Sequence, residues 1–307
     1  CQVAVVTNIG AGDHLGLNFI TTVEDLAVLK RVIIQNVATD GYGVLNATDP
    51  HCVRMGQVCT GRVIFFAADG AYPVLGTHRA QGHRSIWVEA GCIVAGEGEV
   101  RHILALVDMP FTQGGRIGFQ VDNAMAAVGA AWGMGVPWDA IRQGLASFLS
   151  DAGSVPGRFN LMDYQGATVI ADYGHNADAM RALVAAVQAM PGARRSVVIS
   201  GAGDRRDDDI REQTKILGAA FDEVFLFEDA RQRGRAEGEV VGLLRQGLEG
   251  AARTQRIDTI QGEFLAIDTA LARLQPGDLC LVLVDQMQEA LAHLQQRYAE
   301  VAPATAA

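Results

Sequence analysis

Thr168-Val-Ile-Ala-Asp-Tyr-Gly-His-Asn-Ala-Asp-Ala-Met180 is the stretch of sequence that decides the fold. An apolar run breaks at Asp172 into polar residues and then into a helical pattern, which predicts a buried strand, a polar turn and a helix start. Side chains at the carboxyl end of a parallel strand face the crevice where α/β proteins bind ligands. We expect Asp172, His175 and Asn176 to lie together at a site; alternatively, Asp172 only ends a strand, and Asn176 or Asp178 only caps the helix.

The sequence after residue 157 alternates regularly between apolar runs and helical patterns. Strands are predicted over residues 168–171, 196–200, 223–227 and 279–284, and helices over 178–189, 207–220, 238–248, 263–274 and 286–298. This alternation indicates a parallel, Rossmann-like sheet with helices on both faces. Segment 150–157, which concentrates glycine, proline and small polar residues, is the best candidate for a linker.

The first half of the chain also follows an α/β pattern. Strands are predicted over residues 3–6, 43–46, 62–67, 86–88 and 102–107, with a hairpin segment at 92–99. Alanine-rich residues 121–132 predict a helix that packs closely on a sheet, and a second helix follows Pro137. A chain of 307 residues is about twice the usual domain size. We therefore expect an α/β protein with two domains, 1–152 and 153–307.

A shorter helix is predicted between the first two strands. Thr22 followed by Asp25 resembles an N-cap, and the apolar face of the helix would be formed by Leu26, Leu29, Val32, Ile33 and Ile34. Lys30 lies off this face, where a lysine is usually a solvated side chain.

Composition excludes several classes of protein. The net charge is −10 and the sequence has no basic tract, so a nucleic-acid partner is disfavoured. The five cysteines have no C-x-x-C spacing, which fits reduced cytoplasmic thiols rather than disulfides. No apolar run approaches the roughly 20 residues that span a bilayer, and no signal peptide opens the chain. Because Cys1 begins inside an apparent strand, we also expect this chain to be part of a longer one.

Polar residues gather in four loops at predicted strand ends, over residues 8–14, 115–123, 158–175 and 200–206. Gly201 and Gly203 would let backbone N–H groups approach a phosphate or carboxylate, which is weak support for an anion loop. Asp13 and His14 carry donor atoms suited to a divalent ion, although one histidine defines no site. The 307 residues contain no G-x-x-x-x-G-K-[ST] loop and no G-x-S-x-G nucleophile turn.

Taken in order, these clusters resemble the motifs of Mur-type ATP-dependent amino-acid ligases, over essentially the whole chain. The resemblance is strongest to the Mur-ligase-like half of the cyanophycin synthetases. The segments that carry it are Val5-Val-Thr-Asn-Ile-Gly-Ala-Gly-Asp-His-Leu-Gly-Leu17, Val23-Glu-Asp-Leu-Ala-Val-Leu-Lys30, Val121-Asp-Asn-Ala-Met-Ala-Ala127, Pro156-Gly-Arg-Phe-Asn160, Asp172-Tyr-Gly-His-Asn176, Gly203-Asp-Arg-Arg-Asp207 and Gln232-Arg-Gly-Arg-Ala-Glu-Gly-Glu239.

The resemblance implies a partial central ATPase domain followed by a Rossmann-like C-terminal domain. It also implies a reaction: ATP phosphorylates a carboxylate, and an amino group attacks the acyl phosphate to form an amide or isopeptide bond. In cyanophycin synthetases the corresponding half resembles the site that joins arginine to the side-chain carboxylate of a poly-aspartate chain. Phosphoryl transfer depends mainly on positioning and charge neutralisation, so the implied cofactors are ATP and Mg²⁺.

Site residues carry over from the family by position. His14 would be a ligand of Mg²⁺, and Lys30 corresponds to a lysine that many Mur ligases carbamylate into a metal ligand. With Asp172 and His175, these residues would form the catalytic set. The resemblance further implies that Asn123 contacts adenine and that Asp204 and Arg205 meet the incoming amino acid. The ribose and phosphates of ATP would be contacted by Arg158, Asp172, His175 and Asn176.

Three departures from the family pattern bear on activity. The phosphate-binding glycine loop and its lysine would precede Cys1, after an ATP-grasp-like region, so we expect the 307-residue chain alone to be inactive. Ala11 stands where relatives often carry glutamate. Ala177 replaces a proline that would fix the turn after Asn176. A decayed Mur-like scaffold domain and another Mur-type ligase, for peptidoglycan or folate polyglutamate, therefore stay open, as does assembly into a homo-oligomer.

Overall fold

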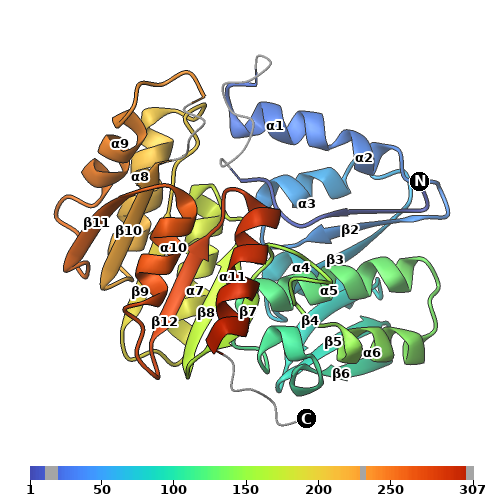
Figure 1. Ribbon diagram of the computed structural model, residues 1–307. Helices are drawn as coiled ribbons and strands as arrows, with labels where there is room; N and C mark the ends of the chain where they lie inside the picture. Colours follow the sequence, from blue (N-terminus) through green and yellow to red (C-terminus); the bar gives the residue numbers. More distant parts are fainter. Residues whose placement is uncertain (11–19, 229–232, 302–307) are drawn as a thin grey trace, which may run out of the picture. The chain divides into compact units, whose positions relative to one another are not determined.

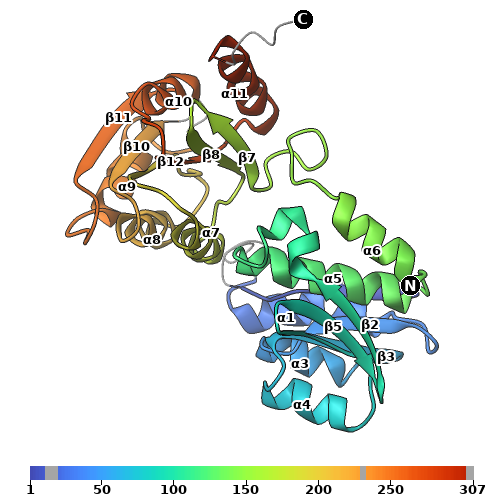
Figure 2. The ribbon, with the colours of Figure 1, turned by 90° about the horizontal axis from the view of Figure 1, so that it is seen from below.

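The computed structural model describes residues 1–10, 20–228 and 233–301, and the chain divides into two compact units, Cys1–Leu149 and Ser150–Ala307. Each unit contains one six-stranded sheet with helices on both sides (Figures 1 and 2). The division falls at the start of the predicted linker. The α/β class and the two sheets rich in parallel strands agree with the fold expected from the sequence.

The sheet of the first unit has the strand order β1-β2-β3-β4-β5-β6. Its first four strands are parallel, and a hairpin adds β5 and β6 in antiparallel register. The strands are β1 (Val3–Val6), β2 (Tyr42–Asn46), β3 (Arg62–Asp69), β4 (Ser85–Glu89), β5 (Cys92–Glu97) and β6 (Val100–Ala105). The helices are α1 (Val23–Lys30), α2 (Val32–Gln35), α3 (Pro50–Gly56), α4 (Pro73–Ala80), α5 (Gly118–Gly133) and α6 (Trp138–Ser147), with short 3-10 turns at Leu106–Asp108 and Pro110–Thr112.

The alanine-rich helix α5 lies against the sheet as closely as its small residues predict. A Cβ atom added to Gly129 would stand 2.6 Å from Cγ1 of Val44 in β2. Since such a separation is far below van der Waals contact, any larger residue here would push the helix off the sheet. Glycine at this position therefore sets the spacing between helix and sheet.

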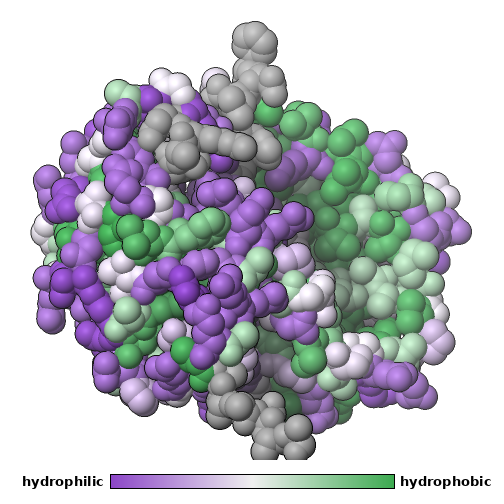
Figure 3. All heavy atoms as spheres, viewed as in Figure 1, coloured by the Kyte–Doolittle hydropathy of each residue, from purple (hydrophilic) through white to green (hydrophobic). Residues whose placement is uncertain are grey.

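Thr22 caps α1 as predicted, in a reciprocal capping box with Asp25. The predicted apolar face of this segment is wrong, however, because the helix is interrupted at Arg31 and restarts as α2. Leu26 and Ile34 are buried, whereas the other three residues of the predicted face, Leu29, Val32 and Ile33, are exposed, as is Val28. They give the surface over α1 and α2 its hydrophobic character in Figure 3.

The second unit has the strand order β11-β10-β9-β12-β8-β7, parallel except for β7. Its strands are β7 (Asn160–Tyr164), β8 (Ala167–Asp172), β9 (Arg195–Ile199), β10 (Glu223–Glu228), β11 (Arg256–Gln261) and β12 (Leu279–Leu283). The helices are α7 (Ala177–Ala189), α8 (Asp207–Gly218), α9 (Glu239–Gly247), α10 (Glu263–Leu271) and α11 (Met287–Val301). Within this unit α7, α8 and α9 cover one face of the sheet, and α10 and α11 cover the other (Figure 2).

Two strands of this sheet have no counterpart in the sequence prediction. β7 and β11 are its two edges, and their residues are mostly half-exposed or exposed. Both strands are therefore more polar than the central strands, which are nearly continuous apolar runs. In the first unit, α3 and α4 lie between strands for which no connecting helix was predicted.

Candidate functional site

The insertion of β12 between β8 and β9 creates a favourable place for a ligand in the second unit. The chain leaves β8 and β9 toward α7 and α8 on one face, and it leaves β12 toward α11 on the other. Ligands of open α/β sheets usually bind at the carboxyl ends of strands where the chain direction switches in this way. Polar side chains lie on both sides of the end of β12: one cluster follows β8, and another follows β9 and β10.

Asp172, the last residue of β8, braces the turns around the first cluster. Its side chain is 8% exposed, and Oδ2 accepts a hydrogen bond from the backbone N–H of Phe159 at 2.9 Å. The N–H of Gly174 also bonds to this carboxyl group. Burial raises the pKa of Asp172 to about 6, against the lowering effect of these two bonds and of nearby Arg158 and His175.

The turn that carries Arg158 is built by its neighbours. Gly157 has a φ of 68°, a left-handed conformation that suits glycine, and its N–H donates to Oδ1 of Asn160 at 2.7 Å. Asn160 is buried and also donates to the backbone oxygens of Ser150 and Val155. These bonds fix the main chain around Arg158 while its side chain is exposed. The motif at 156–160 is thus a shaped turn, a role for Asn160 that the sequence analysis did not assign.

His175 and Tyr173 complete the first cluster. Nδ1 of His175 lies 2.9 Å from the backbone oxygen of Tyr173, and because a carbonyl only accepts, Nδ1 carries the proton. The two rings are 5.1 Å apart, and the Arg158 guanidinium lies 5.9 Å from the centre of the Tyr173 ring. A guanidinium, an imidazole and an aromatic ring thus lie together near the carboxyl end of β8. Such groups can bind anionic and planar parts of a ligand.

Asn176 is the N-cap of α7, and its Oδ1 accepts from the N–H of Ala179 at 2.8 Å. The capping alternative therefore describes its side chain in this structure. Asp172 likewise combines the end of a strand with the bracing of a turn. The opening stretch brings Asp172, His175 and Asn176 together as expected.

The second cluster joins three loops. Asp204, in the loop after β9, lies 3.4 Å from Nη1 of Arg233, which belongs to the loop after β10. Nη2 of the same guanidinium lies 3.6 Å from Oδ1 of Asp285, at the end of β12. Arg233 also has a φ of 49°, which is unusual for a residue other than glycine. Two carboxylates thus flank one guanidinium. Of these three residues, only Asp204 was predicted from the sequence to belong to a site.

Arg235 binds the backbone of the loop at 200–206. Its side chain donates to the backbone oxygens of Gly203 at 2.7 Å and of Arg205 at 2.6 Å. Arg205, expected to meet a substrate, therefore contributes its carbonyl group to this contact.

The start of α8 disfavours an anion at this loop. Three aspartates, residues 207–209, occupy the first turn of the helix, so the positive end of the helix dipole is already neutralised. The same carboxylates also pair with Arg206, Arg211 and Arg235, so these arginines are already engaged and are not available for a phosphate. The loop after β9 is better suited to a cation than to the anion that its glycines alone allow.

The remaining candidates belong to the first unit. Lys30 is the last residue of α1 and is exposed. Asn123 lies on α5, is exposed, and donates from Nδ2 to Oε1 of Gln120 at 3.3 Å. Asp13 and His14 lie outside the described residues. Over residues 1–10, 20–228 and 233–301, no group of three or more histidine, cysteine, aspartate or glutamate side chains is placed to hold a metal ion. In the same ranges no helix has the length and apolarity needed to cross a bilayer.

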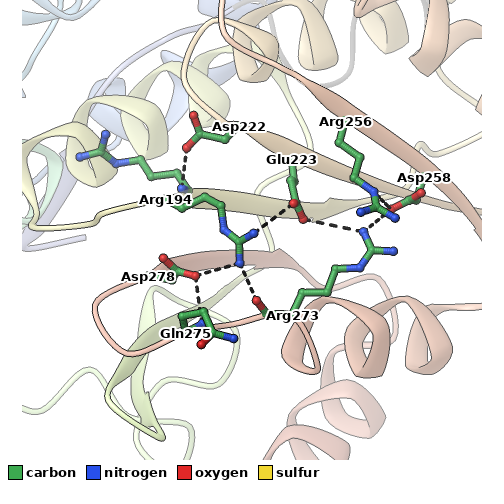
Figure 4. A network of polar contacts seen from close by, with 9 residues as sticks. Arg194, Asp222, Glu223, Arg256, Asp258, Arg273, Gln275 and Asp278 are labelled. Atoms are coloured by element: carbon green, nitrogen blue, oxygen red, sulfur yellow. Dashed lines mark hydrogen bonds and ion pairs between the residues drawn. The ribbon is translucent and has the colours of Figure 1, made fainter.

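A network of ion pairs lies at the opposite end of the strands of the second sheet, toward their amino ends (Figure 4). Arg194 pairs with Asp278 at 3.0 Å and with Glu223 at 3.2 Å, and Arg273 extends the network to Asp258. Arg194, Glu223 and Asp278 lie at or just before the amino ends of β9, β10 and β12, whereas Asp258 is the third residue of β11 and Arg273 follows α10. Because every one of these charges has a partner and the amino ends of the strands lie away from the switch points, this network is structural.

Comparison with known proteins places both units in one family. The Mur ligase middle domain matches residues 1–131, and the Mur ligase glutamate ligase domain matches residues 157–283. The chain belongs to the Mur ligase family. Among solved structures, Escherichia coli FolC in complex with DHPP and ADP has a TM-score of 0.68 at 20% identity, covering 96% of this chain and 61% of that one. This likeness shows that the fold is that of a Mur-type ligase.

The curated relatives include cyanophycin synthetases and ligases of 2,6-diaminopimelate. The cyanophycin synthetase of Crocosphaera subtropica is 34% identical over 298 residues, which are 97% of this chain and 34% of that protein. A UDP-N-acetylmuramoyl-L-alanyl-D-glutamate–2,6-diaminopimelate ligase of Gloeobacter violaceus is 27% identical over 294 residues, or 94% of this chain and 54% of that protein. The chain thus spans about a third of the length of the cyanophycin synthetase that it matches.

Proposed function

We propose that this chain is part of an ATP-dependent carboxylate–amine ligase that adds arginine to the side-chain carboxylates of an acidic polypeptide. The observation that carries the proposal is the 34% identity to a cyanophycin synthetase over 97% of the chain, which includes both Mur ligase domains. ATP would activate the carboxylate as an acyl phosphate, and the amine would attack it. An ATP-grasp-like region of the same protein would be a further partner of this domain pair.

Each unit has residues to which the family resemblance assigns a role in nucleotide binding. In the second unit, Arg158 and His175 would meet phosphate and ribose, with Asn176 at the start of α7 and Asp172 holding the turn between them. In the first unit, Asn123 would contact adenine. Mg²⁺ would be held by His14 and by carbamylated Lys30 together with phosphate oxygens, since Mg²⁺ uses few protein ligands at such sites. Because Asp172 is buried and braced on two sides, its role would be to fix geometry more than to move a proton.

Arginine is the amine that the second cluster suits best. The Arg233 guanidinium lies between Asp204 and Asp285, so the space between these carboxylates accommodates a guanidinium in both charge and shape. The acidic start of α8 adds negative potential beside it. These contacts support a cationic amino acid, with Asp204 and the loop of Arg205 facing it.

The test uses the natural full-length protein, purified and supplied with ATP, Mg²⁺, arginine and poly-aspartate. We expect ADP release that depends on both arginine and acceptor, together with a mass gain of the acceptor. His14→Ala should abolish both signals, and Asp172→Asn should reduce them strongly. Turnover that both variants leave unchanged would instead support a scaffold role for this domain pair.

A second candidate is a peptidoglycan-type ligase, which the relative from Gloeobacter violaceus favours. Replacing arginine by 2,6-diaminopimelate in the same assay distinguishes the two amines. The isolated 307-residue chain should turn over no ATP with either, because it contains no G-x-x-x-x-G-K-[ST] loop. We place the ligase in the cytoplasm, where ATP is available and the free thiols of its five cysteines stay reduced.

A further inference from the structure

Arg235 is the best-anchored arginine at the carboxyl end of the second sheet. Besides its two bonds to backbone oxygens, Nη1 pairs with Glu239 at 2.7 Å and with Asp207 at 2.9 Å. Its side chain is only 16% exposed. The guanidinium thus uses three of its nitrogens at once and connects the loop after β10 with the loop after β9 and the start of α8.

The two backbone bonds of Arg235 fall on either side of Asp204. They hold the carbonyl groups of Gly203 and Arg205, so the backbone is fixed at the peptide unit just before the aspartate and at the Arg205–Arg206 peptide unit one residue beyond it. A planar guanidinium with N–H groups in a rigid fork can hold both carbonyls and both carboxylates together, whereas a lysine ammonium is a single point. The direction of the Asp204 side chain therefore depends on Arg235.

The loop contains two glycines, which make its backbone more dependent on such contacts. Gly201 and Gly203 increase the conformational freedom of the chain, and a turn bond joins the N–H of Arg205 to the oxygen of Ala202. The anchor of Arg235, in contrast, is secured: Glu239 also accepts from the N–H of Ala236 at 3.1 Å. Arg235 thus ties the loop after β9 to the first residue of α9, Glu239.

We infer that Arg235 is a positioning residue that preforms the amino-acid loop of the ligase by fixing Asp204. The inference rests on the proposed function, since it assigns the loop to substrate binding. It predicts that losing the guanidinium weakens the use of the amino acid and leaves the nucleotide unaffected.

The kinetic test compares Arg235→Ala, Arg235→Lys and Arg211→Ala in the natural full-length protein. Arg211 is a matched control, because it also pairs with Asp207 and with a second acid, Asp208, but contacts no carbonyl of the loop. We expect Arg235→Ala to raise the KM for arginine about tenfold or more, with the KM for ATP changed less than about twofold. Arg235→Lys should restore only part of the loss, and Arg211→Ala should leave both constants within about twofold of the parent.

A second readout is independent of ligation. Amide hydrogen exchange should quicken in the peptide covering residues 200–206 of Arg235→Ala and stay unchanged in Arg211→Ala. If the protein ligates no amino acid, the proposed function fails, and exchange still decides whether Arg235 orders the loop. An unchanged KM for arginine in an active Arg235→Ala protein, or unchanged exchange in that loop, would overturn the inference. Should Arg235→Ala not fold, Arg235→Lys supplies the same two readouts.

Discussion

The pH dependence of stability should reveal the buried carboxyl group of Asp172. Its pKa rises from an ordinary 3.8 to about 6, chiefly because of burial, so the folded protein binds a proton more tightly than the unfolded chain does. The resulting stability is fully present below about pH 4 and is lost as the pH rises through 6. At 1.36 kcal/mol per pH unit, the loss amounts to about 3 kcal/mol.

Asp172→Asn removes this dependence. The amide oxygen can still accept from the N–H of Phe159, whereas the amide nitrogen cannot accept from Gly174, which costs about 1–3 kcal/mol at any pH. The absolute difference between the two proteins at neutral pH is therefore small, because the two effects oppose each other. The pH dependence distinguishes the two proteins. Between about pH 4 and about pH 8, the free energy of unfolding of the parent should fall by about 3 kcal/mol relative to that of Asp172→Asn.

Urea unfolding of the chain, at pH values on either side of the isoelectric point of about 5.1, measures the trend. All three tryptophans belong to the first unit, so their fluorescence follows that unit, while circular dichroism follows both. Asp122→Asn is the matched control, since burial raises the pKa of Asp122, in α5, to about 6 as well. Asp122→Asn should change the pH dependence of the unfolding transition that tryptophan fluorescence follows. A difference between the parent and Asp172→Asn that does not vary with pH would refute the reasoning.

Three further variants test separate parts of the structure. Ala177→Pro should stabilise the chain by about 0.5–1 kcal/mol in urea unfolding, because Ala177 is the first residue of α7, where proline is favoured; a loss of stability would contradict this. Asp278→Ala should cost about 2–3 kcal/mol, since it leaves the partly buried Arg194 short of a partner, whereas the fully exposed Asp139→Ala should cost less than about 0.5 kcal/mol. In the full-length enzyme, Arg233→Ala should lower the KM for arginine about two- to fivefold by removing an internal competitor; a higher KM would show that Arg233 itself binds substrate.

Local pattern was enough to predict the interior of both sheets. A central parallel strand is buried on both faces and so becomes an apolar run, as Ala167–Asp172 and Leu279–Leu283 are. The edge strands Asn160–Tyr164 and Arg256–Gln261 escaped prediction because edges need less apolar surface. Similarly, the prediction of an apolar face across residues 26–34 assumed one straight helix, but the helix breaks at Arg31 and three of the five residues of that face are exposed.

The candidate site was predictable only where its residues are close in sequence. Asp172, His175 and Asn176 come together because a strand end, a turn and a helix start follow one another directly. Arg233 and Asp285 are 52 positions apart (285 − 233) and meet only because β12 returns between β8 and β9. Strand order depends on the whole sheet, so no local pattern could have placed the second carboxylate.

The two ends of the second sheet differ in how firmly their charges are paired, and this difference suggests which end exchanges partners. At the amino ends, Arg194 holds Asp278 at 3.0 Å, and that carboxylate is 7% exposed. At the carboxyl ends, Arg233 lies 3.4 and 3.6 Å from its two carboxylates, and all three side chains are at least a quarter exposed. A short, buried pair is costly to break, whereas long, solvated contacts contribute little. An incoming cation can therefore replace Arg233 at little cost, while the pairs at the amino ends keep the sheet intact.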